Sequence, residues 1–181
     1  MLEARSRIAD TSRVLKRLRS EGGFGLVELL IAMVMLNIGL LAVVASFSSG
    51  IVSLNRASRL TTAAVIADQQ MELYRALTHS SIRLDTSAVG TTDAKYVNDP
   101  VLGGSTAGLV TASCAGPPDE CNPSRKVVGA DRKDYRLDTY ITQFTPTGGR
   151  AVKKVTIVVR DWNNLAVTFA RQASTFDIST G

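Results

Sequence analysis

The sequence predicts an α+β protein in which one long N-terminal helix packs on an antiparallel β-sheet. Residues 52–79 contain no proline and no glycine, and their apolar residues recur at helical spacing. In the C-terminal third, three segments alternate apolar and polar residues and are separated by short turn sequences. The chain has 181 residues, which is enough for one modest domain after an N-terminal membrane segment.

Residues 1–23 form a basic leader with a net charge of +3, out of +5 for the whole chain. Its basic residues are Arg5, Arg7, Arg13, Lys16, Arg17 and Arg19. Basic residues directly before an apolar segment are expected on its cytoplasmic side. The alternative is a solvated basic helix over residues 4–19. Because the charge is concentrated in the leader, it is weak evidence for nucleic-acid binding.

Residues 24–51 are expected to form the membrane-embedded half of the helix. From Leu29 to Phe47 only Asn37, Gly39 and Ser46 interrupt the apolar sequence, and about 20 such residues span a bilayer core. The predicted topology is a single pass through the cytoplasmic membrane, with the C-terminus outside. Residues 52–181 are then an extracytoplasmic domain.

The helix is predicted to continue beyond the membrane, from about Phe24 to about Thr78. Its second half, within residues 52–79, carries one apolar stripe that would face the domain. The stripe consists of Ala57, Leu60, Ala64, Ala67, Met71, Tyr74 and Leu77. The alternative is two helices with a break near Gly50.

Residues 80–130 are rich in turn-forming residues and are predicted to be a variable loop with at most one or two short strands, such as Gly108–Ala112. This loop contains both cysteines, Cys114 and Cys121. We expect them to form an intrachain disulfide in an exported domain, because a turn-rich loop of this length can bring the two Cα atoms close enough. The alternative is two free thiols.

Residues 131–176 are predicted to form a β-meander with strands near 135–142, 154–159 and 165–170. One sheet face would cover the apolar stripe of the helix. Trp162, in the second turn, is expected to fold back onto the core, with an exposed contact residue as the alternative. A basic patch that could bind DNA is considered on the sheet, against an ordinary solvated face; its residues are Arg150, Lys153, Lys154 and Arg160.

No catalytic, metal or cofactor site is predicted. The chain has one histidine, His79, and no Cys-x-x-Cys pair. The glycine-rich segment 103–108 lacks the lysine of a phosphate-binding loop. A Ser-His-Asp triad is improbable without a nucleophile motif.

Glu28 is the only acidic residue between Gly22 and Ala67, and it stands in the apolar run. A charge inside a membrane segment costs roughly 2.5–3.5 kcal/mol, so Glu28 requires a partner. The segment Gly23-Phe24-Gly25-Leu26-Val27-Glu28-Leu29-Leu30-Ile31-Ala32 resembles the processing signal of type IV prepilins and of type II secretion pseudopilins. The N-terminal half looks most like that of a minor pilin of the PilV kind.

The resemblance implies that prepilin peptidase cuts between Gly23 and Phe24 and methylates the new amine of Phe24. That ammonium group could neutralise Glu28 in the same chain or in a neighbouring subunit. The implied partners are the peptidase, other pilin subunits, membrane lipid before assembly, and the pilus or secretion machinery. The implied function is structural, in a type IV pilus or in a type II secretion pseudopilus, and the mature protein would reach the cell surface or the periplasm.

Three rival interpretations remain at this point. An ordinary export signal would be cut near Val43-Val44-Ala45, where small residues loosely fit a cleavage site. A plain anchor would stay unprocessed. An anchored extracytoplasmic enzyme or binding domain would use the helix only as a tether. None of them explains a glutamate in the apolar run beside Gly-Phe.

Overall fold

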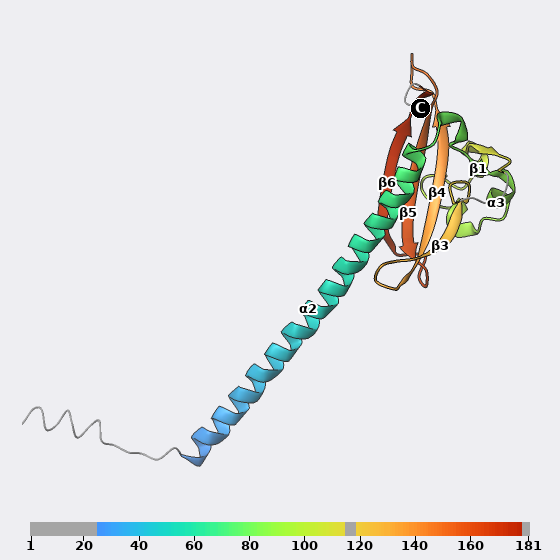
Figure 1. Cartoon of the computed structure of the whole chain (residues 1–181). Coiled ribbons are helices and arrows are strands. Elements are labelled where there is room, and N and C mark those ends of the chain that lie inside the picture. The colour runs from blue at the N-terminus through green and yellow to red at the C-terminus, as the bar shows by residue number, and fades with distance from the viewer. Residues whose placement is uncertain (1–24, 115–118, 179–181) are drawn as a thin grey trace, which may run out of the picture. The chain divides into compact units, whose positions relative to one another are not determined.

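The computed structural model describes residues 25–114 and 119–178. The chain divides into two compact units between Ile51 and Val52. The first unit contains the beginning of helix α2, and the second contains the end of α2 and all the strands (Figure 1).

Helix α2 runs from Leu26 to Arg75 as a single element of 50 residues. This confirms the predicted continuous helix, with no interruption at Gly50. The amide groups of Glu28 and Leu29 both donate to the carbonyl oxygen of Gly25, at 2.9 and 3.2 Å, and close the first turn. A short 3-10 helix, η1 (His79–Ser81), follows the end of α2.

The sheet contains four antiparallel strands in the order β3-β4-β5-β6. Their bounds are Ser124–Val128 for β3, Asp134–Phe144 for β4, Val152–Asp161 for β5 and Thr168–Phe176 for β6. The predicted meander is confirmed, but β3 had been placed in the loop. The last strand also begins later than predicted, because the turn after β5 extends to Val167, whose amide donates to Asn164 O at 2.9 Å.

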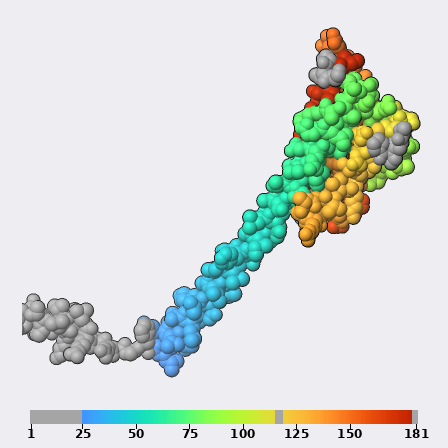
Figure 2. Space-filling view, viewed as in Figure 1, coloured from blue at the N-terminus to red at the C-terminus, as the bar shows by residue number. Residues whose placement is uncertain are grey.

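Within the second unit, α2 packs on one face of the sheet from Ala63 onward (Figure 2). The buried helix residues are Ala63, Ile66, Ala67, Gln70, Met71 and Tyr74. The predicted stripe is therefore only partly correct, since Ala57, Leu60 and Ala64 are exposed. A polar residue belongs to the buried face instead: Gln70 accepts from the Arg125 guanidinium at 2.9 Å and donates to Asp119 O at 3.2 Å.

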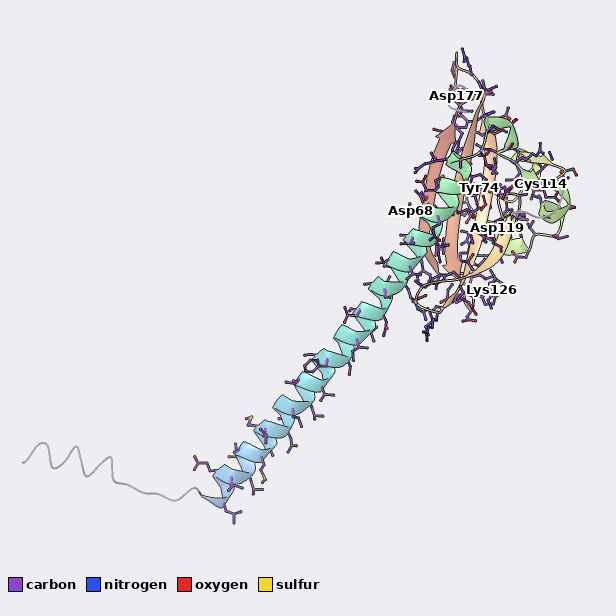
Figure 3. The ribbon with its side chains drawn as sticks, in the orientation of Figure 1. Asp68, Tyr74, Cys114, Asp119, Lys126 and Asp177 are labelled. Atoms are coloured by element: carbon purple, nitrogen blue, oxygen red, sulfur yellow. A yellow bond between two sulfur atoms is a disulfide. The ribbon has the colours of Figure 1, made fainter. Side chains whose placement is uncertain are left out.

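Tyr74 is the last buried residue on this face of the helix. Its ring is fully buried, and its hydroxyl donates to the carbonyl oxygen of Glu120. Burial raises the pKa of Tyr74 to about 12, so the hydroxyl stays protonated as a donor. Figure 3 shows Tyr74 on the side of α2 toward the strands, whereas Asp68 is exposed on the other side.

Residues 82–114 fold into a run of short elements, and those around α4 (Ala94–Val97) cover the opposite face of the sheet. The other elements are β1 (Leu84–Asp85), α3 (Thr86–Gly90), η2 (Thr106–Gly108) and β2 (Thr111–Ala112). Tyr96 is fully buried, donates to Thr139 O at 2.6 Å, and stacks on Tyr140 with ring centroids 4.4 Å apart. Much of the predicted variable loop thus packs on the sheet as a layer, and the central strands β4 and β5 are buried on both faces over most of their length.

Six charged side chains, four of them buried, join this layer to the sheet, and we call them the buried ion cluster. They are Asp93, Asp99, Asp138, Arg136, Arg160 and Arg171. Asp138 is 0% exposed and accepts from Arg136 Nε at 2.8 Å and Arg160 Nε at 3.0 Å. Asp99 accepts from Arg160 and from Arg171. Burial opposes the ionisation of Asp99, but its bonds from the Val101 amide and both arginines outweigh burial and lower its pKa.

Neither the basic patch considered on the sheet nor the solvated face that was favoured over it is correct for Lys153 and Arg160, which are buried. Arg160 belongs to the buried ion cluster, and Lys153 is 7% exposed and donates to His79 O and Ile82 O at 2.7 and 2.8 Å. Arg150 and Lys154 are exposed as expected. The prediction failed because it assumed that the sheet had one solvated face. The expected core position of Trp162 is also wrong, because its side chain is 41% exposed.

The two cysteines form the predicted disulfide, Cys114–Cys121, with Cα atoms 6.6 Å apart. Asp85 forms hydrogen bonds with the backbone of both cysteines. Its carboxylate accepts from Cys114 N at 2.9 Å, and its own amide donates to Cys121 O at 2.9 Å. The same carboxylate caps α3 by accepting from Ser87 N and Ala88 N.

Asp85 should make the fold acid-sensitive. Hydrogen bonds from Ser87, Cys114 and Ala88 lower its pKa from 3.8 to about 2. A lowered pKa in the folded state means that the unfolded chain binds the proton first, so this stabilisation is present above pH 3.8 and is lost as the pH falls through about 2. We expect the wild-type melting temperature to fall more over this interval than that of Asp85→Asn, measured by circular dichroism. Equal falls would remove Asp85 as the cause.

Candidate processing and assembly site

Of the three residues predicted for processing and assembly, only the one in the first turn of α2 is described by the structure. Glu28 lies in this turn. Gly23 and Phe24, the predicted cleavage position, lie outside the described residues, so the structure does not test the predicted pairing of Phe24 with Glu28.

Glu28 differs from the other polar side chains of the first unit. Asn37 Nδ2 donates to Met33 O at 2.9 Å, Ser46 Oγ to Ala42 O at 2.9 Å, and Ser48 Oγ to Val44 O at 3.1 Å. These groups satisfy their hydrogen bonding inside the helix, which makes them tolerable in an apolar environment. Glu28 pairs with none of the described residues, so its charge needs a group that they do not provide.

The surface around Glu28 is apolar on all sides of the helix. The large hydrophobic side chains from Leu26 to Leu54 are each at least 51% exposed. By length and composition this helix could cross a membrane, since its most apolar window has a mean hydropathy of 2.5 and none of that window is buried. A helix that is apolar all round is stable only in lipid or among other apolar helices.

Comparison with known families decides what this N-terminal segment is. Residues 18–44 match the family model described as the prokaryotic N-terminal methylation motif. The chain carries the type IV pilin signal. The matched range contains Gly23, Phe24 and Glu28. Searches of curated proteins and of solved structures gave no match.

The signal and the fold agree with each other. The long apolar N-terminal helix and the four-stranded antiparallel sheet form an α+β, pilin-like architecture. The motif supports membership of the type IV pilin or pseudopilin class. It points to a structural protein that is anchored in a membrane and processed by prepilin peptidase. Within the described residues, no group of three or more His, Cys, Asp or Glu side chains could hold a metal ion.

Gly23 should control processing if the assigned position is correct. A protease must bring its catalytic groups close to the peptide bond, and glycine has no side chain to obstruct that approach. We expect Gly23→Val to block cleavage, leaving a longer membrane-bound species on immunoblots. Gly25→Ala is the matched control, since an added Cβ there would meet nothing within 4 Å. Normal processing of Gly23→Val would show that the cleavage site lies elsewhere.

Proposed function

We propose that the protein is a minor pilin, a structural subunit that joins or primes a type IV pilus after cleavage and N-methylation. The observation that carries this proposal is the methylation motif at residues 18–44, joined to a helix whose only charge in the apolar stretch is Glu28. The resemblance of the N-terminal half to minor pilins supports the finer assignment.

Processing would create the positively charged group that Glu28 requires as a partner. Hydrolysis of the bond between Gly23 and Phe24 leaves a carboxylate on the leader and an ammonium group on Phe24, four residues before Glu28 in the sequence. In a filament, the Phe24 ammonium of one subunit would pair with Glu28 of its neighbour. This pair would fix the axial register, because apolar helices packed side by side slide against one another without a large penalty.

The apolar surface of α2 explains how the subunit leaves the membrane. Lipid surrounds residues 26–54 before assembly, and the helices of neighbouring subunits would surround the same surface afterwards. The exchange is feasible because helix–helix packing replaces lipid contacts at an apolar surface of similar character. The disulfide fits an oxidising compartment outside the cytoplasm, which is where the second unit would reside.

Fractionation of the host cells tests this function. Filaments sheared from the cell surface should contain the protein, starting at Phe24, and deletion of its gene should reduce the number of filaments. A type II pseudopilin would give the opposite pattern. The protein would be absent from sheared filaments, and its deletion would stop the export of secreted enzymes.

A further inference from the structure

A groove lies in the second unit beside residues 55–60, which follow the apolar segment directly in the sequence. It has a volume of about 730 Å³ and is lined by residues from three places in the sequence. Asn55, Arg56 and Arg59 come from α2, Asp131 and Lys133 from the β3–β4 turn, and Val167 from the β5–β6 turn. We call the end of the second unit formed by residues 55–60, 126–134 and 161–169 the junction face.

The junction face has more positive charge than its own acids neutralise. Asp161 pairs with Arg59 at 2.9 Å, and Asp134, at the start of β4, pairs with Lys126 at 2.9 Å. Asp131 accepts from the Tyr135 hydroxyl at 2.7 Å.

Three further exposed cations stand against the single carboxylate of Asp131, so the face has an excess of two positive charges. The side chains of Arg56, Arg132 and Lys133 make no hydrogen bond or ion pair with the described residues. The face therefore fits a partner that carries negative charge.

The same end of the second unit also exposes apolar and aromatic groups, among which Val167 lines the groove and Trp162 and Val128 lie outside it. Trp162 is 41% exposed, Val167 is 38% exposed, and Val128, directly before the β3–β4 turn, is 63% exposed. Lys126 Nζ lies 5.2 Å from the centre of the Trp162 ring. Tryptophan beside lysine and arginine is typical of the membrane–water interface, where one end of the indole is apolar and the other is wet.

The length of the apolar segment places this face at the depth of the lipid headgroups. From Leu26 to Leu54 the helix contains 29 residues, which extend about 43 Å at 1.5 Å per residue. A bilayer with its headgroup layers is about 40–45 Å thick. Asn55 is the next residue, so chain connectivity alone brings the groove to the headgroup layer when residues 26–54 span the bilayer.

We infer that the junction face docks on anionic phospholipid headgroups while the subunit waits in the membrane before assembly. The inference rests on the proposed membrane insertion of the helix. The three further cations of this face bind the lipid phosphates, and Trp162 enters the interfacial layer. Attraction of this kind between basic residues and anionic lipid is weakened by salt.

The single tryptophan of the chain provides a direct test. The processed protein, residues 24–181, is placed, one copy per disc, in lipid nanodiscs that contain either zwitterionic lipid alone or added phosphatidylglycerol. A trace lipid with a spin-labelled headgroup quenches the fluorescence of Trp162 at short range. We expect quenching to be stronger in the anionic discs and to fall to the zwitterionic level at high salt.

Charge-reversal variants assign the effect to the junction face. Arg56→Glu with Lys133→Glu should abolish the extra quenching, whereas Arg150→Glu with Lys154→Glu, which also reverses two exposed cations, should preserve it. The salt series on the unaltered protein supplies the same test if the first pair fails to fold. Equal quenching in both kinds of disc would overturn the inference.

Two further outcomes separate this inference from the proposed function. A chain that is retained in the discs but shows no quenching leaves membrane insertion standing and removes only the headgroup contact. A chain that is not retained contradicts both. If Trp162 emission changes only when two copies share a disc, whatever the lipid, a second copy covers the face and the inference is wrong.

Discussion

A Glu28→Ala subunit is expected to be cleaved and methylated normally and yet to be nearly absent from filaments. In the proposed assembly, the Phe24 ammonium of one subunit meets Glu28 of another in a low-dielectric helix bundle. Removing one partner of a buried ion pair leaves the other charge uncompensated and costs about 3–5 kcal/mol. That penalty corresponds to a loss of incorporation of more than about 100-fold.

The measurement is the amount of the protein in sheared filaments relative to the membrane fraction. Ser46→Ala is the matched control, because Ser46 is also polar in the same helix but bonds only to Ala42 O within its own chain. It should incorporate as the wild type does. If Glu28→Ala incorporates as well as Ser46→Ala, the charge pair does not govern docking.

Asp138→Ala is expected to destabilise the second unit by about 3–5 kcal/mol, because it leaves two buried arginines without their shared carboxylate. Asp138 is fully buried and also accepts from Ser124 Oγ at 2.7 Å, which connects β3 to β4. Arg136 and Arg160 are 5% and 3% exposed, so water cannot replace the lost contacts. Urea unfolding followed by circular dichroism measures the change.

Asp134→Ala is the control for this prediction. Asp134 pairs with Lys126 at 2.9 Å, but both side chains are more than a third exposed. An exposed pair of this kind contributes about 0.2–1 kcal/mol. Similar losses for the two variants would mean that the buried ion cluster does not hold the elements around Asp93 and Asp99 on the sheet.

The elements with strong local periodicity could be predicted from the sequence. The continuous α2 and strands β4 and β5 were expected because their patterns are long and regular. The disulfide was expected from two cysteines in one turn-rich loop. The signal around Glu28 was expected because a lone carboxylate in an apolar run beside Gly-Phe is unusual enough to identify.

The layer formed within residues 82–114 could not be predicted, because its helices and strands are too short to show periodicity. The amino-acid sequence of β5 nevertheless indicates that a layer covers its second face. Val155–Val159 contains a single polar residue, Thr156, and a nearly continuous apolar run is typical of a strand covered on both faces. Lys153 and Arg160 flank this run and therefore belong to a strand without a solvated face. The ion pairs themselves depend on Asp93 and Asp99, whose approach to β4 and β5 is a tertiary event.

Mass spectrometry of the intact protein extracted from host membranes is the most direct measurement of the proposed processing. The prediction is a chain that begins at Phe24, carries one methyl group on its N-terminus and retains the Cys114–Cys121 disulfide. A chain that begins at Met1, or one cut at Ser46 after an ordinary export signal, would contradict the assignment of a pilin-type subunit.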